Sequence, residues 1–327
     1  MQTNSSGEGM TCVDGLESFR FRTQVSAFGH DCQIFDASVR FKESLQTYKV
    51  ISKKFRGSTL CRTFGLNEFH AIKDKFATVN EVSIAIKNAG LESSNLIIGI
   101  DFTASNEWQG RKSFGGRSLH HVFSNTKRLN PYQRVVQVIT KTLEPFDEDK
   151  LIPTFGFGDS VTKDHSVFSF NEDGTPCNGL CDVLKQYTEV VRRVSLSGPT
   201  SFAPIINKAI EIVKQEKSYN ILVIVADGQV VEEHERSTRD AIVEASYYPL
   251  SIIVVGVGDG PWDRMHEYDN MLPQRRFDNF QFVEYEAVIH NAKHPDTSFA
   301  LHALMEIPDQ YKVLNELGLI KAKAKDD

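Results

Sequence analysis

Oxygen-bearing side chains in three short segments have the types and spacing of metal ligands. The first segment supplies Asp101, Thr103 and Ser105 at alternate positions, the second holds Thr200, and the third begins at Asp227. A hard cation such as Mg²⁺ takes about six oxygen ligands, of which only one or two need be carboxylates. Two Asp and three hydroxyl side chains meet that demand and leave the bound ion electrophilic. We therefore predict a divalent-cation site with an open position, at which a carboxylate of another molecule binds.

Apolar runs rich in Ile and Val come directly before Asp101 and Asp227, and similar runs recur along the chain. Such runs are typical of strands buried on both faces, as in parallel sheets flanked by helices. In these sheets ligands collect at the carboxyl ends of the strands, where the predicted metal ligands fall. The sequence therefore predicts a doubly wound α/β fold with a mainly parallel central sheet flanked by helices. The expected strands are 96–101, 152–157, 221–226, 250–257 and 280–283, and the expected helices are 82–89, 132–143, 180–194, 202–216, 238–246 and 298–306.

Signals for regular structure become consistent from Phe76 onward. Thr78 and Glu81 have the spacing of a capping box at the start of a helix, and Gly90 suits the left-handed residue after its end. The preceding stretch has weak periodicity. We predict an irregular N-terminal region over residues 1–75, one domain over residues 76–320 and a charged tail over residues 321–327.

The composition is that of a protein with a full hydrophobic core. The 327 residues are 40% hydrophobic and 24% charged, with a formal net charge of −6. A nucleic-acid-binding protein normally has a basic excess or a strongly basic face. We therefore expect no nucleic-acid partner.

The cysteines and the N-terminal sequence indicate a place inside the cell. Five cysteines form an odd set without an evident disulfide framework, which favours a reducing compartment. Cys177 and Cys181 resemble half of a zinc site, but no second pair has ligand spacing, so we expect no structural zinc. The N-terminus lacks the apolar run of a secretory signal, and no stretch reaches the roughly 18 apolar residues of a transmembrane helix. We expect a cytoplasmic protein, with the nucleus and peripheral attachment to a membrane as further locations.

The three metal-ligand segments resemble the metal-ion-dependent adhesion site of von Willebrand factor A domains. Further motifs make the likeness more specific, because they are similar to the copine type of A domain, which is also found in plant copine-like RING ubiquitin ligases. These motifs are GPTSFA at residues 198–203, LVIVADG at 222–228, VGVGDGPW at 255–262, FDNFQF at 277–282 and ALMEIP at 303–308. The resemblance covers about residues 76–320 and implies the A-domain fold, which is Rossmann-like.

The resemblance also implies ligands and a function. Metal ligation falls to Asp101, Thr103, Ser105, Thr200 and Asp227, with Mg²⁺ or Mn²⁺ as the ion and Ca²⁺ as an alternative. The implied function is that of a non-catalytic module inside the cell, which captures an Asp or Glu of a protein partner through the ion. A metal-dependent hydrolase would instead want a general base near the metal.

Two departures from these families leave other functions open. Copines carry tandem C2 domains for calcium-dependent phospholipid binding, and residues 1–75 are too few to hold them. The copine-like ligases end in a Cys/His-rich RING, whereas the last cysteine here is Cys181. The alternatives are a substrate-binding or partner-binding component of a ubiquitin ligase system and a calcium-dependent phospholipid-binding protein.

A basic loop follows the first metal-ligand segment and should lie beside the ion. Trp108 is the expected aromatic contact at the surface. Arg111, Lys112 and Arg117 could bind acidic partners or anionic phospholipid headgroups. Charge clusters on loops are often only solvated, so a loop without a binding role is the alternative.

Other conspicuous residues have a structural interpretation. His120 and His121 do not have the spacing of metal ligands, and we expect Trp262 to be buried over the end of the sheet. The glycine-rich segment 256–260 lacks the spacing of a phosphate-binding loop, so we expect a plain turn from a strand to a helix.

Overall fold

The computed structural model describes residues 76–320, apart from residues 125–127, 229 and 272–274. The predictions for residues 1–75 and for the tail 321–327 lie outside this part of the chain. Within it, no helix combines the length and the apolar character needed to cross a membrane.

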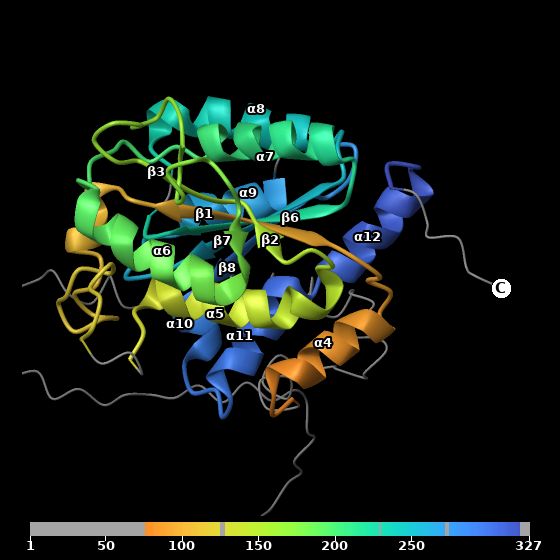
Figure 1. Cartoon of the computed structure of the whole chain (residues 1–327), viewed down its shortest axis with the longest axis horizontal. Coiled ribbons are helices and arrows are strands. Elements are labelled where there is room, and N and C mark those ends of the chain that lie inside the picture. The colour runs from red at the N-terminus through yellow and green to blue at the C-terminus, as the bar shows by residue number, and fades with distance from the viewer. Residues whose placement is uncertain (1–75, 125–127, 229, 272–274, 321–327) are drawn as a thin grey trace, which may run out of the picture. The chain divides into compact units, whose positions relative to one another are not determined.

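A six-stranded sheet forms the centre of the described domain (Figure 1). Its order is β4-β3-β1-β6-β7-β8; β4 is antiparallel to β3, and all other neighbours are parallel. A separate ladder pairs β2 with β5. With helices on both faces, this arrangement confirms the predicted fold class. The strands are β1 (Asn95–Asp101), β2 (Leu151–Ile152), β3 (Thr154–Phe157), β4 (Phe168–Ser169), β5 (Cys177–Asn178), β6 (Asn220–Ala226), β7 (Leu250–Gly256) and β8 (Phe280–Glu284).

The helices form one layer on each face of the sheet. The pair α7 and α8 lies above the sheet in Figure 1, whereas α5, α6, α10 and α11 lie below it. The α-helices are α4 (Val79–Asn88), α5 (Pro131–Leu143), α6 (Gly179–Arg193), α7 (Ala203–Glu216), α8 (Glu235–Ala245), α9 (Asp263–Met271), α10 (Tyr285–Ile289), α11 (Pro295–Leu304) and α12 (Ile307–Glu316). Short 3-10 turns are η1 (Ala104–Glu107), η2 (Glu144–Phe146) and η3 (Glu232–His234).

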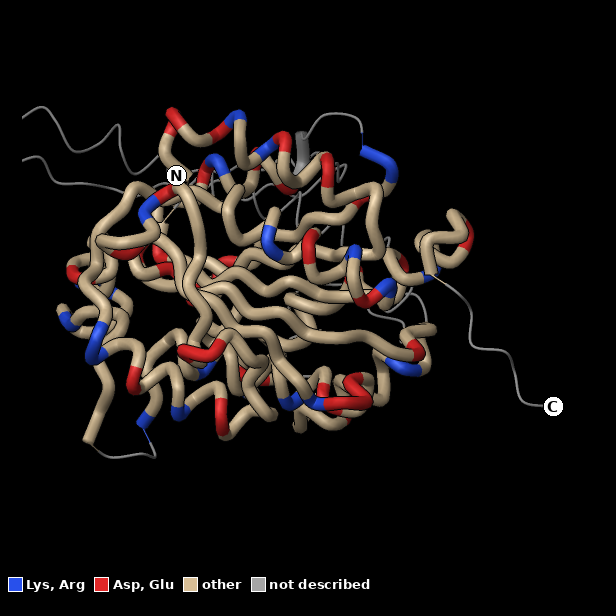
Figure 2. Tube along the Cα trace, turned by 45° about the horizontal axis from the view of Figure 1, so that its top comes forward, with Lys and Arg blue, Asp and Glu red and all other residues tan. Residues whose placement is uncertain are grey.

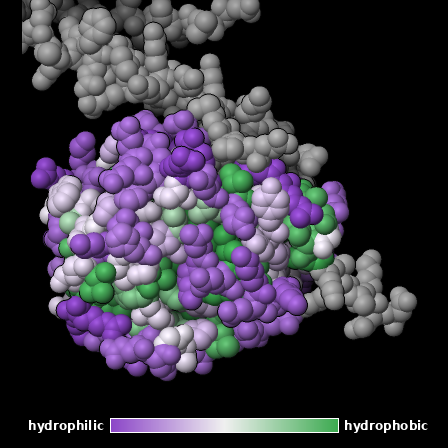
Figure 3. Space-filling view, turned by 90° about the horizontal axis from the view of Figure 1, so that it is seen from above, coloured by the Kyte–Doolittle hydropathy of each residue, from purple (hydrophilic) through white to green (hydrophobic). Residues whose placement is uncertain are grey.

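Side chains of the central strands alternate between two apolar clusters. In β1, Ile98 and Ile100 pack with the helices α5 and α6, whereas Ile97 packs with α7 and α8. Because both faces are buried, β1, β6 and β7 have the continuous Ile/Val runs that predicted them. The outer surface over α7 and α8 is mainly hydrophilic, with small apolar patches (Figure 3). These helices are therefore amphipathic covers of the sheet.

The structure corrects the expected strand 152–157. Pro153 has no N–H group to donate, and the segment divides there into β2 and β3, which belong to different sheets. Neither β4 nor β5 was expected from the sequence, because a two-residue strand is too short to have a pattern. Helices α10 and α12 were not expected either, and the helix expected after the glycine-rich turn, α9, was predicted without bounds. Among the side chains of α9 that the structure describes, Met265 and Tyr268 contribute to the apolar cluster, so its helical periodicity is weak.

The signals at the ends of α4 are largely present. Thr78 Oγ1 accepts a hydrogen bond from Glu81 N at 3.3 Å, and Gly90 has a φ of +114°. The Glu81 carboxylate accepts from Ala77 N at 2.9 Å, rather than from the backbone of Thr78 as a capping box requires. The predicted helix start is therefore right, but the Glu81 carboxylate binds the backbone N–H of Ala77, one residue before the expected partner.

The expected burial of Trp262 is confirmed, since its side chain is only 6% exposed. A Cβ atom at Gly256 would lie 2.8 Å from the indole ring, so the glycine allows the ring to pack directly against the end of β7. The glycine-rich segment is a turn between β7 and α9, as expected.

Replacing Ile206 on α7 by Ala should destabilise the domain strongly, because this side chain is 0% exposed. We expect Ile206→Ala to lower the free energy of unfolding by about 2–5 kcal/mol. The matched control is Ile84→Ala on α4, where the side chain is 52% exposed and the expected change is below about 1 kcal/mol. Urea unfolding followed by circular dichroism measures both, and equal losses would contradict the assignment of the core.

Candidate metal centre

The candidate site lies at the carboxyl ends of β1 and β6. Asp101 is the last residue of β1, and Asp227 directly follows β6. The two strands are parallel neighbours, with Ile100 paired with Val225, so both Asp residues reach the same edge of the sheet. The chain continues from β1 to β3 on one side, while β6 lies on the other. This is the switch point at which such sheets form a crevice.

Hydrogen bonds join four of the predicted ligand residues. The backbone N–H of Thr103 donates to Asp101 Oδ1 at 2.8 Å. Thr103 Oγ1 lies 3.0 Å from Ser105 Oγ, and Ser105 Oγ donates to Asp227 Oδ1 at 2.9 Å. Thr103 and Ser105, at the start of η1, therefore connect the segment after β1 to the Asp227 carboxylate.

The fifth residue, Thr200, belongs to a segment that contacts both loops of the site. Ser197 forms a β-bridge with Thr103, and its carbonyl accepts from Ala104 N at 2.7 Å. The carbonyl of Thr200 accepts from Val231 N at 3.4 Å. The Thr200 side chain, which is 7% exposed, is therefore held beside the loops that follow β1 and β6.

Both carboxylates carry an oxygen that is buried and has no partner within the protein. Asp101 and Asp227 are each 0% exposed, and the Oδ2 atom of each accepts no hydrogen bond. An ionised carboxylate buried in this way is costly unless a cation compensates it. Two free carboxylate oxygens beside hydroxyl groups fit the ligand preference of Mg²⁺ or Mn²⁺.

The site contains few acidic groups for a metal centre. No group of three or more His, Cys, Asp and Glu residues that could hold a metal occurs in the described part of the chain. Ligation by the two carboxylates alone would be incomplete. Hydroxyl groups and solvent would therefore have to complete the ligand set.

The burial of the two carboxyl groups raises their pKa values. The pKa of Asp101 rises from 3.8 to about 6 because burial disfavours its charged form. The pKa of Asp227 rises to about 8, through burial first and through the negative charge of Asp101 second. In the absence of a cation the pair therefore retains a proton near neutral pH.

A network of uncharged groups fixes the backbone of the first segment. His120 Nε2 lies 2.9 Å from the carbonyl oxygen of Asp101, and Nδ1 lies 2.8 Å from the Tyr187 hydroxyl. Because a carbonyl oxygen can only accept, Nε2 carries the proton and Nδ1 accepts from Tyr187. Burial lowers the pKa of His120 to about 3, which keeps the ring neutral. The ring stacks on Phe102 and Tyr132. His120 therefore supports the strand end.

Sequence reasoning missed Asn106, which holds the same turn from inside. Its Nδ2 group donates to the carbonyl of Thr103 at 3.0 Å and to that of Asp101 at 3.4 Å, while its Oδ1 atom accepts from Tyr132 at 2.6 Å. The signal was an Asn one residue after the last hydroxyl of the segment. That position alone did not reveal that the side chain is fully buried.

Gly158 was also missed, although it directly follows β3. It has a φ of +81°, and a Cβ atom there would lie 2.6 Å from Thr103 Cγ2 and 3.4 Å from Asp101 Oδ1. Only glycine suits this conformation and this close approach. A glycine at the carboxyl end of a strand, beside the predicted ligands, was the available signal.

The predicted contact residues lie on the loop after η1, beside the site. Trp108 is 49% exposed, and Arg111, Lys112 and Arg117 are exposed. The backbone N–H groups of Lys112 and Ser113 each donate to the Asp259 carboxylate at 2.8 Å, so this loop is tied to the turn after β7. Figure 2 shows acidic and basic residues interspersed over the rest of the domain.

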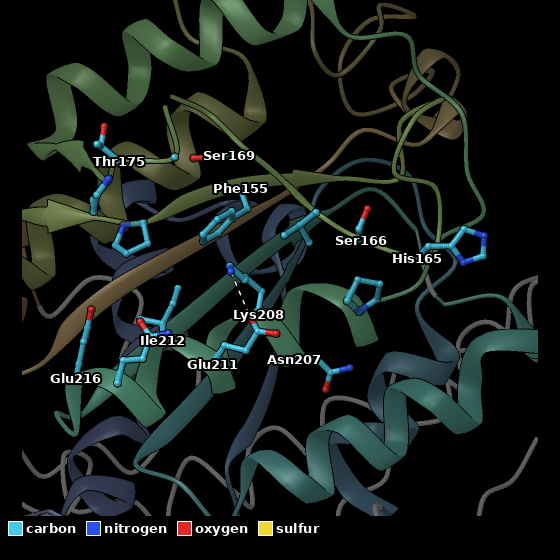
Figure 4. A pocket seen from close by; sticks show the side chains of 16 residues that line it. Phe155, His165, Ser166, Ser169, Thr175, Asn207, Lys208, Glu211, Ile212 and Glu216 are labelled. Carbon is cyan, nitrogen blue, oxygen red and sulfur yellow. Dashed lines mark hydrogen bonds and ion pairs between the residues drawn. The ribbon is translucent and has the colours of Figure 1, made fainter. Parts of the chain in front are cut away.

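A cavity of about 670 Å³ lies elsewhere, between α7 and the β3–β4 edge (Figure 4). Phe155 and Ile212 contribute apolar surface to it. The charged groups on its walls are already paired: Lys208 binds Glu211 at 3.0 Å, and Glu216 accepts from Asn95 at 3.2 Å. It has no buried carboxylate pair like that at the sheet edge, which therefore remains the better candidate for a functional site.

The mixed sheet with an antiparallel edge strand, the helices on both faces and the Asp and hydroxyl groups at its carboxyl edge define a von Willebrand factor A-type α/β domain. Residues 118–323 match the family model described as Copine. This match covers more than half of the 327 residues, and the chain belongs to the copine family.

Three similar proteins agree with this assignment. E3 ubiquitin-protein ligase RGLG5 of Arabidopsis thaliana is 51% identical over 267 residues, which cover 77% of this chain and 61% of that protein. E3 ubiquitin-protein ligase RGLG1 of the same plant is 53% identical over 266 residues, which cover 77% of this chain and 54% of that protein. Copine family protein 2 of Caenorhabditis elegans is 50% identical over 272 residues, which cover 82% of this chain and 4% of that protein. The chain thus spans less than two thirds of each of these relatives.

Solved structures show a more distant likeness. The manganese-loaded TRAP protein of Plasmodium vivax is similar over 64% of this chain and 74% of that chain, with 11% sequence identity and a TM-score of 0.39. A likeness of this size is too distant to inform the ligands of the present chain.

The raised carboxyl pKa values predict that the metal-free protein loses stability as the pH rises. The folded state holds the protons on Asp101 and Asp227 more tightly than the unfolded state, where the pKa is near 3.8. This contribution is complete below 3.8 and is lost as the pH passes about 6 and about 8. Urea unfolding in EDTA over this pH range measures it.

The matched variant for this prediction is Asp227→Asn, which cannot ionise at the buried position. We expect its free energy of unfolding to depend less on pH than that of the wild type. A wild-type stability that is constant or rises through the same range would contradict the raised pKa values.

Proposed function

We propose that this domain is a non-catalytic binding module, which captures a carboxylate of a protein partner through a divalent cation. The ion is held by Asp101, Thr103, Ser105, Thr200 and Asp227. Mg²⁺ or Mn²⁺ is the favoured ion, because Ca²⁺ usually takes more oxygen ligands than this set provides. The proposed location is the cytoplasm, with the nucleus and a membrane surface as further sites of action.

One observation carries the proposal: the two buried carboxylate oxygens without a partner, Asp101 Oδ2 and Asp227 Oδ2. A cation between them would remove the cost of burying the charges and displace the proton that the pair retains. Because only two ligands are anionic, the bound ion would keep a positive field. An Asp or Glu of a partner would complete its coordination.

The Asp101 carboxylate should be essential for binding the ion. Calorimetric titration of Mg²⁺ and Mn²⁺ into the wild type should give saturable binding, and Asp101→Ala should abolish it. The free energy of unfolding of the wild type should rise by about 2.7 kcal/mol when the metal concentration is one hundred times its dissociation constant.

The matched control is Asp240→Ala, since Asp240 is an exposed residue of α8 that lies outside the site. Its metal affinity should equal that of the wild type. A folded wild type that binds neither ion would sink the proposed function.

Asn106 should strengthen metal binding without being a ligand, because it fixes the carbonyls of Asp101 and Thr103. We expect Asn106→Ala to weaken Mg²⁺ binding by about 10–100-fold, the usual effect of removing a group that orients metal ligands. Asn207→Ala on the exposed side of α7 is the control. An Asn106→Ala protein that is less stable but binds Mg²⁺ with unchanged affinity would show that the residue is only structural.

A second candidate is supported by the names of two plant relatives, both E3 ubiquitin-protein ligases, which are 51% and 53% identical to this chain. In this case the domain would serve a ubiquitin ligase system by binding its substrate or another component. Its contribution would still be binding through the same metal centre, so this candidate specifies the setting in which the first would act.

A further inference from the structure

The loop after β1 separates the candidate metal centre from a cavity of about 540 Å³. Side chains at alternate positions belong to the two sites. Thr103 and Ser105 join the metal centre, whereas Phe102 and Ala104 line the cavity. The two sites are therefore separated by the thickness of a single chain. We call this cavity the Trp108 cavity, after the exposed aromatic residue on its wall.

The Trp108 cavity is lined largely by apolar side chains that remain open to solvent. Trp108 is 49% exposed, and half-buried Val191, Val194 and Leu196, from the last turn of α6 and the segment after it, also line the cavity. Val122 contributes from the segment before α5. Exposed apolar surface of this kind marks interaction sites, and aromatic residues often supply much of the binding energy. The cavity therefore suits an apolar side chain.

The segment after α6 also joins the cavity to the metal centre. Leu196 lines the cavity, the next residue, Ser197, bridges to Thr103, and Thr200 is a proposed ligand. The loop after β1 and the segment after α6 therefore each contribute residues to the cavity and to the candidate metal centre. A partner segment that binds at one site can reach the other within a few residues.

Exposed apolar side chains continue around the carboxyl edge of the sheet. Val161, on the loop after β3, is 84% exposed, and Val231, on the loop after β6, is 38% exposed. With Trp108 they make up three of the six large hydrophobic side chains that are exposed among the described residues. Their position on loops around one site indicates a face that a protein partner covers.

We infer that the Trp108 cavity receives an aromatic or branched aliphatic side chain from the same protein segment whose Asp or Glu binds the metal ion. This inference rests on the proposed function and specifies the partner's chemistry. In an extended segment neighbouring side chains alternate in direction, so the apolar residue lies within a few positions of the acidic one. Exposed Glu107, Glu232 and Glu233 lie at this edge together with exposed Arg111, Lys112 and Arg117, so its charge does not favour an anionic membrane over a protein segment.

The test uses labelled Gly/Ser peptides that each hold one Asp, with Phe, Leu or Ser at one nearby position. Fluorescence anisotropy measures their binding to the full chain in MgCl₂, and Asn peptides and EDTA provide parallel arms. We expect the Phe or Leu peptides to bind roughly tenfold more tightly than the Ser peptide, the effect of burying one apolar side chain. The tighter binding should require both Mg²⁺ and the Asp.

Two variants change the cavity in different ways. Trp108→Ala removes an exposed wall, and Val191→Phe fills the space from α6. Each should reduce the affinity for the Phe or Leu peptides to that for the Ser peptide, with Mg²⁺ affinity measured for each protein. The matched control is Tyr247→Ala, at an aromatic residue that is 53% exposed before β7, at the amino ends of the strands. It should leave every affinity unchanged.

The outcomes separate this inference from the function on which it rests. Mg²⁺ binding with no preference for apolar peptides, or with no peptide binding at all, overturns the inference and leaves the metal centre. Apolar binding that persists in EDTA or with Asn peptides also overturns it, because the two sites would then be independent. Binding to phosphatidylserine vesicles that Trp108→Ala abolishes would assign the cavity to a membrane. Absence of Mg²⁺ binding by the wild type removes the proposed function itself.

Discussion

The burial of two carboxylates at adjacent strand ends is the constraint on which this domain depends. Asp101 and Asp227 lie at one edge of the sheet because β1 and β6 are parallel neighbours in register. Each has an oxygen without a partner, and each has a raised pKa. Charges placed in this way require a proton or a cation. The loops after β1 and β6 hold the two carboxylates in place through hydrogen bonds from Thr103 N and Ser105 Oγ.

The support for the pair is built from neutral groups. His120 and Asn106 hold the carbonyl of Asp101, and they are held in turn by Tyr187 and Tyr132 from α6 and α5. A cationic support would compete with a metal ion for the carboxylates, whereas neutral donors to the backbone fix the geometry without neutralising them. This explains how a buried histidine can lie beside the proposed ligands without being one.

The match to the copine family model covers residues 118–323, which include Thr200 and Asp227 of the candidate site. The chain spans only part of the length of its relatives, from 4% of one nematode protein to 61% of one plant protein. The proposed binding of a metal ion and a carboxylate therefore concerns this domain and not the whole length of those relatives. In the proposed mode of binding, the Trp108 cavity would add apolar selectivity to the candidate metal centre, which would otherwise accept any accessible carboxylate. That combination suits a protein partner better than a small anion.

The sequence by itself determined the fold class and most of the central strands, because Ile/Val runs are local signals, and it predicted the candidate ligands from their types, their spacing and a family resemblance. It did not reveal the break at Pro153, the bounds of the weakly patterned helix α9 or the roles of Asn106 and Gly158. The relation between the Trp108 cavity and the metal centre was also invisible, since its walls come from segments far apart in the chain. Only the tertiary structure decided these features, because burial, close approach and hydrogen bonding depend on which distant segments meet.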